Sequence, residues 1–109
     1  MRITDLLTKD TINLSLESTS KANVILELVE VLDRAGKLTN SDEFKKAILA
    51  REAQSTTGIG EGIAIPHAKT NAVKESAIAF GRSNAGINYE SLDGQPAHLF
   101  FMIAAKEDA

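Results

Sequence analysis

The sequence has no cysteine and no tryptophan, and it has only two prolines and two histidines among its 109 residues. Without cysteine there is no disulfide scaffold, no thiolate nucleophile, no Cys-x-x-Cys redox motif and no cysteine zinc site. His67 and His98 are too few and too far apart in sequence to indicate a metal site. His67 and the hydroxyl side chains therefore remain as the main candidates for a nucleophile.

An excess of positive charge and a long apolar run are also absent. Twelve Lys and Arg against fifteen Asp and Glu give a net charge of -3. We expect no nucleic-acid partner, because phosphate neutralisation needs clustered basic side chains. The longest apolar stretch, residues 99–105, is too short to span a bilayer, and residues 1–8 carry no signal peptide. We expect a cytoplasmic domain without direct membrane insertion, or the cytoplasmic part of a larger protein.

The residues that are present suit a single globular domain. Apolar side chains make up 43% of the chain and charged ones 25%. This supplies one hydrophobic core and not two, so residues 1–109 are expected to form one domain.

Two segments have helical periodicity. Apolar residues recur at helical spacing over 24–35, after the hydroxyl-rich segment 18–20 and before Gly36, which is a natural C-terminal stop. A second helix is predicted over about 40–54, where an Asn and a Glu three residues later have capping-box spacing.

Extended segments accompany these helices. Residues 11–17 alternate between polar and apolar, as in a half-buried strand, and 63–65 is a short β-type run. Segments 76–81 and 97–104 are apolar on both faces, which indicates strands covered by helices. The predicted fold is an α/β/α sandwich, with a mixed β-sheet flanked by helices on both faces.

The sequence ends at residue 109, just after a strand that reads as central. Nothing in the remaining residues would cover the second face of that strand. We therefore expect the C-terminal part of the domain to be missing from this chain.

A glycine run, Gly58, Gly60 and Gly62, resembles a loop that cradles phosphate. Both common nucleotide fingerprints need a helix directly after the loop, whereas a strand and a proline follow here. The Gly-Lys-Ser/Thr of the P-loop is also absent. We interpret the run as a flexible bend between a helix and a strand.

Two side chains near this run could carry chemistry. His67 directly follows Pro66 at the end of a predicted strand, where α/β folds present ligands. It is either a nucleophile or an ordinary surface or core histidine. Arg51, near the end of the second helix, is either a solvated charge or a guanidinium that binds phosphate. His98 lies within an apolar strand, and we interpret it as structural.

The segment from Arg51 to His67 reads REAQSTTGIGEGIAIPH. It closely resembles the active-site segment of the fructose/mannitol-type (type 2) enzyme IIA domains of the bacterial phosphoenolpyruvate-dependent sugar phosphotransferase system. The match is long and ordered, and it ends in a Gly-Ile-Ala-Ile-Pro-His signature. A more general similarity in the order of residue types extends over essentially the whole chain. Residues 1–7 look like the start of a fructose-specific IIA domain, such as the N-terminal domain of a IIABC permease.

The resemblance implies a phosphohistidine carrier. Phospho-HPr would donate a phosphoryl group to Nε2 of His67, and the domain would pass it to a cysteine of an enzyme IIB domain. That IIB domain, possibly in one chain with membrane IIC, would phosphorylate a sugar, fructose by resemblance, during uptake. Arg51 would supply a guanidinium, and Thr57 and the Gly58 region would supply hydroxyl and amide donors. No metal or other cofactor is implied, because the phosphate arrives on a protein.

The same resemblance leaves other readings open. Family members continue into further helices that carry a second active-site histidine, and His98 lies too early to match it. A nitrogen-type regulatory IIA protein shares the Pro-His segment and uses phosphorylation as a switch on protein partners. A IIA-like module within a transcriptional regulator is a further version of that switch. The fructose-type look of the N-terminal half favours transport, although IIB and IIC, not these residues, recognise the sugar.

Overall fold

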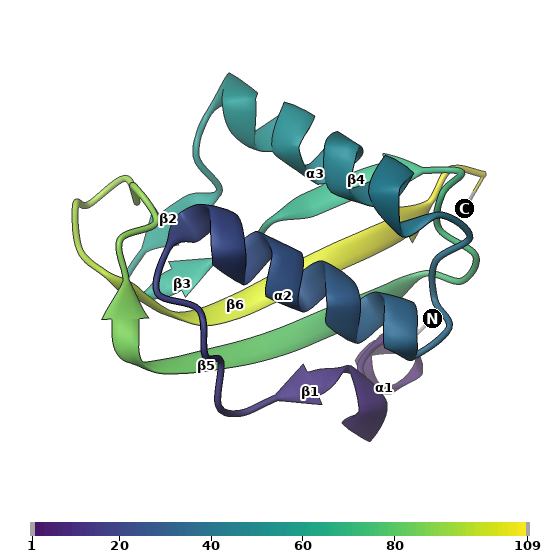
Figure 1. Cartoon of the computed structure of the whole chain (residues 1–109), viewed down its shortest axis with the longest axis horizontal. Coiled ribbons are helices and arrows are strands. Elements are labelled where there is room, and N and C mark those ends of the chain that lie inside the picture. Colours follow the sequence, from purple (N-terminus) through teal and green to yellow (C-terminus); the bar gives the residue numbers. More distant parts are fainter. Residues whose placement is uncertain (1, 109) are drawn as a thin grey trace.

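The computed structural model describes residues 2–108 of the chain. In chain order, the elements are α1 (Ile3–Leu6), the 3-10 helix η1 (Lys9–Thr11), β1 (Ile12–Asn13), α2 (Lys21–Arg34), α3 (Ser41–Gln54), β2 (Gly58–Gly60), β3 (Ile63–Ala64), β4 (His67–Thr70), β5 (Ala77–Ile87) and β6 (Ala97–Lys106). The strands of this described part form one mixed sheet in the order β1-β5-β6-β3-β2, with β4 also paired to β6 (Figure 1). Within residues 2–108 no helix has the length and apolar character needed to cross a bilayer.

Strand β6 is the centre of the sheet. It pairs antiparallel with β5 along one edge, and parallel with β3 and then β4 along the other. Pro66 interrupts that second edge because it has no N–H to donate, but its carbonyl accepts a hydrogen bond from the Ile103 amide (2.9 Å). The chain therefore leaves β3, passes Pro66 and returns to the same neighbour at His67.

The two long helices confirm the sequence prediction. Ser20 caps α2 by accepting a hydrogen bond from the Asn23 amide, and Asn40 caps α3 through the Glu43 amide. After α2, Gly36 has a φ of 75°, the left-handed conformation that ends many helices.

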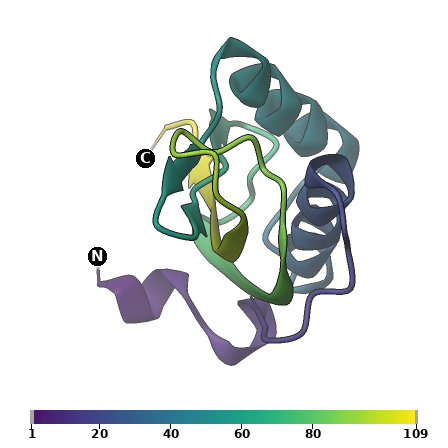
Figure 2. The same cartoon turned by 90° about the vertical axis from the view of Figure 1, so that its left-hand side faces the viewer.

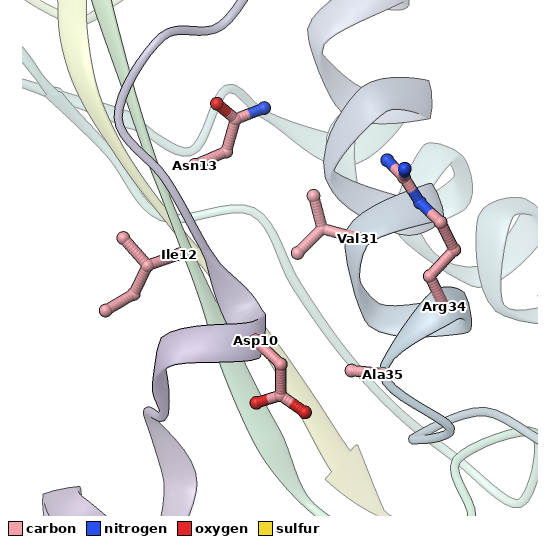
Figure 3. Close-up of a pocket in the computed structure, with 6 residues that line it drawn as sticks. All are labelled: Asp10, Ile12, Asn13, Val31, Arg34 and Ala35. Carbon is pink, nitrogen blue, oxygen red and sulfur yellow. The ribbon is translucent and has the colours of Figure 1, made fainter.

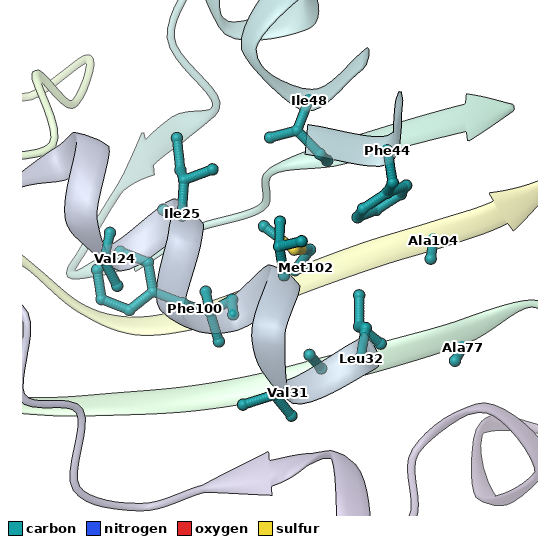
Figure 4. Close-up of a cluster of buried hydrophobic side chains, with 14 of the residues drawn as sticks. Val24, Ile25, Val31, Leu32, Phe44, Ile48, Ala77, Phe100, Met102 and Ala104 are labelled. Atoms are coloured by element: carbon teal, nitrogen blue, oxygen red, sulfur yellow. The ribbon is translucent and has the colours of Figure 1, made fainter. Parts of the chain in front are cut away.

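The hydrophobic core lies between these helices and one face of the sheet (Figures 1 and 2). Figure 4 shows side chains of α2 and α3, among them Ile25 and Phe44, gathered over Phe100 and Met102 of β6. All four side chains are fully or almost fully buried. Burial of one such side chain contributes about 1.5–3 kcal/mol, so this layer fixes the helices on the sheet.

The opposite face of the sheet, called the second face below, is apolar and only half buried. Ile78 pairs with Ile103 and Phe80 with Phe101, and the two phenyl rings lie 5.1 Å apart. Among the described residues, only the short α1 lies on the side away from α2 and α3, where it contacts β5 (Figure 2). The predicted mixed sheet with helices is confirmed, but the two long helices share one face instead of flanking both.

Three extended segments differ from the prediction. Strand β1 occupies only two residues of the expected 11–17, because the Asn13 side chain accepts the Ser15 amide and turns the chain. The glycine run is not merely a bend: it forms β2 and a turn into β3, which pairs with it. His67 does not trail a strand but opens β4, since Pro66 interrupts the pairing without ending it.

Candidate functional site

His67 is the first residue of β4 and is partly exposed. The next residue, Ala68, packs against the core beneath the helices. Side chains alternate along a strand, and His67 pairs in register with Ile103, so the imidazole lies on the second face. The histidine is therefore held by a strand of the sheet and stands outside the core.

One hydrogen bond decides the protonation pattern of this imidazole. Nδ1 of His67 lies 2.8 Å from the carbonyl oxygen of Ile65. A carbonyl only accepts, so Nδ1 carries the hydrogen and Nε2 of the neutral ring has the free lone pair. The site thus presents Nε2 as a nucleophile of defined direction.

The carbonyl that orients the imidazole is itself fixed. The Ile65 amide donates to the carbonyl of Thr57 (2.9 Å), and the next carbonyl, that of Pro66, accepts from Ile103. The backbone before His67 is thereby tied to β2 on one side and to β6 on the other. Little freedom remains for the carbonyl of Ile65 to turn.

Arg51 lies in the last turn of α3, the helix that packs against β4. Its Nη1 donates to the Ser55 carbonyl (2.9 Å) and lies 3.5 Å from the Ser55 hydroxyl. Among residues 2–108 it forms no ion pair with a carboxylate, and no hydrogen bond joins it to His67. The guanidinium charge is therefore free of an internal counter-ion, and an anion could engage it.

Thr57 and Gly58 have their donors engaged inside the protein. The Thr57 hydroxyl donates to the carboxylate of Glu52, and so does the Thr57 amide (3.3 Å). The Gly58 amide donates to the Thr56 hydroxyl (3.1 Å). A Cβ at Gly58 would lie 2.4 Å from the Ser91 hydroxyl oxygen, so only glycine fits this close approach of β2 to the loop after β5.

Glu52 is the residue that sequence reasoning missed. Its side chain is 5% exposed, and its carboxylate lies 3.0 Å from Nζ of Lys21 and 3.0 Å from the Tyr89 hydroxyl. Burial by itself raises the pKa of Glu52, but hydrogen bonds from Thr57, Lys21 and Tyr89 outweigh it and hold that pKa below its ordinary value. The Tyr89 pKa is raised by burial and by the adjacent carboxylate. A single sequence holds no signal for this cluster, because Tyr89 is 37 residues away.

The second histidine lies at the other end of β6. His98 is exposed, and its Nδ1 donates to the Ser83 carbonyl (2.9 Å), which links β6 to β5. Its ring also lies against Gly86, where a Cβ would approach it to 2.9 Å. These contacts agree with the interpretation of His98 as a structural residue.

A surface hollow of the described chain lies away from His67. It has a volume of about 320 Å³ and lies between β1 and α2, at the border of the sheet opposite to β2 and β3 (Figure 3). It is lined by Asp10, Ile12, Asn13, Val31, Arg34 and Ala35. None of these residues contributes to the hydrogen bonds around His67, so the hollow is separate from the histidine site.

An α/β domain with a histidine of free Nε2, and an arginine without a counter-ion on the helix beside it, has the parts of a phosphohistidine carrier. Residues 5–109 match the family described as "Phosphoenolpyruvate-dependent sugar phosphotransferase system, EIIA 2". The chain belongs to this family, and it is a phosphoryl-carrying EIIA component of that system.

Two relatives show the range of lengths in which such a domain occurs. The chain is 68% identical over 109 residues to the "PTS system fructose-specific EIIABC component" of Bacillus subtilis, covering all of this chain and 17% of the relative. It is 42% identical over 106 residues to the "PTS system fructose-specific EIIA component" of Haloferax volcanii, covering 94% of this chain and 69% of that protein. The chain thus spans less than a fifth of the first relative.

Solved structures share the fold. The nitrogen regulatory protein IIA-Ntr of Neisseria meningitidis superposes with a TM-score of 0.89 at 32% identity, over 98% of this chain and 73% of that one. Enzyme IIAMTL of Escherichia coli, solved in complex with phosphorylated enzyme IIBMTL, gives a TM-score of 0.82 at 25% identity, over 94% and 74% of the two chains.

Proposed function

We propose that residues 1–109 form a single phosphocarrier domain in which Nε2 of His67 accepts a phosphoryl group from phospho-HPr and passes it to a cysteine of an EIIB domain. The observation that carries the proposal is the hydrogen bond from Nδ1 of His67 to the carbonyl of Ile65. It leaves Nε2 as the one ring nitrogen with a lone pair to attack phosphorus.

The two transfers are chemically symmetrical. In the first, the Nε2 lone pair forms a bond to phosphorus while the bond from phosphorus to the donor breaks and returns its electron pair to the donor. In the second, a cysteine thiolate forms a bond to phosphorus, and the electron pair of the Nε2–phosphorus bond returns to Nε2. The hydrogen stays on Nδ1, hydrogen-bonded to the Ile65 carbonyl, throughout, so His67 needs no proton transfer in either step.

Three further residues are proposed to stabilise the phosphoryl group. Arg51 would bind its oxygens, since among residues 2–108 its guanidinium has only the neutral Ser55 as partner. Thr57 and Gly58 are proposed to supply hydroxyl and amide donors. In the unphosphorylated structure these donors bind Glu52 and Thr56, so direct participation would require them to exchange partners.

The partners and the sugar follow from the relatives. The Bacillus subtilis relative carries fructose-specific A, B and C parts in one chain, and the Escherichia coli IIAMTL structure contains a phosphorylated IIB enzyme. We propose that this domain likewise serves an EIIB domain, in one chain with membrane EIIC, in fructose uptake. It would then work on the cytoplasmic side of the membrane, without nucleic acid and without inserting into the bilayer itself.

We further propose that additional C-terminal residues complete the α/β/α sandwich by covering the second face. The side chains of Ile78, Phe80, Phe101 and Ile103 support this arrangement, because they form paired apolar rows on β5 and β6 and remain partly exposed. The chain also covers only 73% of the IIA-Ntr structure, which leaves room for such a segment.

A second candidate function is regulatory. The superposition on IIA-Ntr, with a TM-score of 0.89, supports a phosphorylation switch that acts on protein partners. Both functions use the same phosphorylated His67 and differ in what recognises it. Transfer of the phosphoryl group to an EIIB cysteine would favour transport, whereas a phosphorylated protein that EIIB fails to discharge would favour regulation.

The decisive test is intact-mass spectrometry after incubation with phosphoenolpyruvate, enzyme I and HPr. We expect the mass of one phosphoryl group, lost on acid treatment, in the parent protein. His67→Ala should lose this gain while keeping the fold, and the control His98→Ala should retain it. A parent that gains no phosphoryl group, also when the chain is extended beyond residue 109, would contradict the proposal. Undiminished labelling of His67→Ala would exclude this histidine.

A further inference from the structure

Glu52 occupies the junction of four segments of the chain. It lies in the last turn of α3, and its carboxylate contacts Lys21 at the start of α2, Thr57 before β2, and Tyr89 in the loop after β5. These partners donate four hydrogen bonds to one carboxylate whose side chain is only 5% exposed. A buried carboxylate is tolerated only when it is paired and fully hydrogen-bonded, and Glu52 meets both conditions.

A continuous series of hydrogen bonds leads from this carboxylate to the imidazole. Glu52 holds Thr57 by its hydroxyl and its amide, and the Thr57 carbonyl accepts from the Ile65 amide (2.9 Å). The Ile65 carbonyl then accepts from Nδ1 of His67 (2.8 Å). Only two residues therefore separate Glu52 from the ring that carries the chemistry.

We propose, on the basis of the proposed function, that Glu52 is a positioning residue for His67. By fixing Thr57 it fixes the carbonyl of Ile65, which keeps the hydrogen on Nδ1 and aims the Nε2 lone pair. When that carbonyl turns away, the two neutral tautomers of the imidazole interconvert freely. The molecules that then carry the hydrogen on Nε2 cannot attack phosphorus through this nitrogen.

The anchors of Glu52 explain why its position is firm. Nζ of Lys21 meets the carboxylate at 3.0 Å and also lies 4.7 Å from the centre of the Tyr89 ring. The Tyr89 ring packs edge-on against Phe100 in the core, with ring centroids 5.6 Å apart. The carboxylate is therefore anchored, through Lys21 and Tyr89, to Phe100 in the core at the centre of the sheet.

The charge of Glu52 is also kept away from the phosphoryl chemistry. Lys21 neutralises it from the side of α2, while the neighbouring Arg51, within the described part of the chain, binds only neutral atoms of Ser55. An anionic group beside Arg51 without such a counter-ion would compete with the phosphoryl group for the guanidinium. The ion pair of Glu52 with Lys21 thus leaves the Arg51 charge available.

The experiment compares Glu52→Gln with Glu27→Gln, a matched control on α2. The Glu27 carboxylate is also partly buried and also accepts four hydrogen bonds, from Asn13, Glu17 and twice from Ser18. Its pKa is likewise below the ordinary value, because these hydrogen bonds outweigh the effect of burial. None of its partners belongs to the series that leads to His67, so it reports the loss of a structural carboxylate alone.

Two quantities are measured on each protein: the tautomer population of His67 from its imidazole 15N chemical shifts, and the rate of phosphoryl acceptance from phospho-HPr. For Glu52→Gln we expect a larger fraction of hydrogen on Nε2 and an acceptance rate about tenfold lower, with the KM for phospho-HPr within about twofold. Glu27→Gln should change neither quantity, even where it lowers the melting temperature as much. Tyr89→Phe removes one donor from Glu52, keeps the ring, and should give an intermediate effect.

The outcomes separate the two proposals. The positioning role is wrong if Glu52→Gln and Tyr89→Phe keep the parent's tautomer and rate. It is also wrong if Glu27→Gln changes both quantities as much as Glu52→Gln does. If Glu52→Gln does not fold, Tyr89→Phe decides by the same two measurements. A parent protein that phospho-HPr does not phosphorylate would overturn the proposed function, while the tautomer measurement would still test whether Glu52 orients the ring.

Discussion

At the scale of single residues, Arg51 and Glu52 are neighbours with opposite surroundings. The Glu52 carboxylate is buried and meets Lys21, whereas the Arg51 guanidinium binds neutral oxygens of Ser55. The sequence could nominate His67 and Arg51, because a Pro-His pair and a helix-end arginine are visible in one short segment. It could not nominate Glu52, because the residues that donate hydrogen bonds to this carboxylate come together only in the folded chain.

We predict that Arg51→Ala slows phosphoryl acceptance by about 100-fold, since one donor to a developing anion contributes about this much. The fold should persist, because the side chain binds only Ser55 at the end of α3. Initial rates by intact-mass spectrometry and thermal melting provide the two measurements. Arg34→Ala, an exposed arginine in the last turn of α2, is the control and should accept at the parental rate. An Arg51→Ala rate equal to that of Arg34→Ala would reduce Arg51 to a helix-end charge.

At the scale of elements, a helix or strand could be predicted where its residues form a long enough periodic pattern of apolar side chains. Helix α2 presents several turns of periodic apolar residues, and α3 has a shorter apolar stripe with Phe44 and Ile48; each also begins with a side-chain cap, and both were predictable. Strand β2 has only one side chain, that of Ile59, between two glycines, and β4 has no apolar alternation. Their pairing depends on β3 and β6, so no local property of these residues specifies a strand.

The close approach of β2 to the loop after β5 gives a prediction for Gly58. Gly58→Ala should lower the free energy of unfolding by about 1–3 kcal/mol, because its Cβ would overlap Ser91. The Ser91 hydroxyl is buried and has no hydrogen-bond partner in the described structure, so Ser91→Ala should cost little.

A double-mutant cycle in urea checks this contact. Gly58→Ala with Ser91→Ala should recover part of the lost stability, because the closest atom, the Ser91 oxygen, is gone. Strict additivity of the two substitutions would show that the strain at Gly58 does not come from the Ser91 hydroxyl.

At the scale of the whole molecule, the two faces of the sheet are built differently. Phe100 lies beneath α2 and α3 and is fully buried, whereas its neighbour Phe101 lies on the second face and is half buried. The alternation of strand side chains was visible in the sequence only as an unbroken apolar run. The sequence could not show that both long helices pack on the same face of the sheet, because tertiary packing decides which face a helix covers.

The two neighbouring phenylalanines allow a direct comparison of these faces. We predict a loss of about 3–5 kcal/mol in the free energy of unfolding for Phe100→Ala, which leaves a cavity in the core. Phe101→Ala should lose only about 1–2 kcal/mol, because its ring is partly exposed and its removal leaves no enclosed cavity. Urea unfolding of both variants measures the difference, and equal losses would contradict the distinction between the faces.

The hydrogen bond from His67 to the carbonyl of Ile65 has a consequence for how the carrier handles its cargo. Under the proposed function, loading and unloading would both occur at Nε2, while Nδ1 on the other side of the ring would keep the carbonyl of Ile65 as its partner. The imidazole need not turn over, tautomerise or wait for a proton between one partner and the next. The donor and the acceptor would therefore meet the same ring nitrogen in the same orientation, first as the attacking group and then as the leaving group, and the phosphoryl group could be exchanged reversibly.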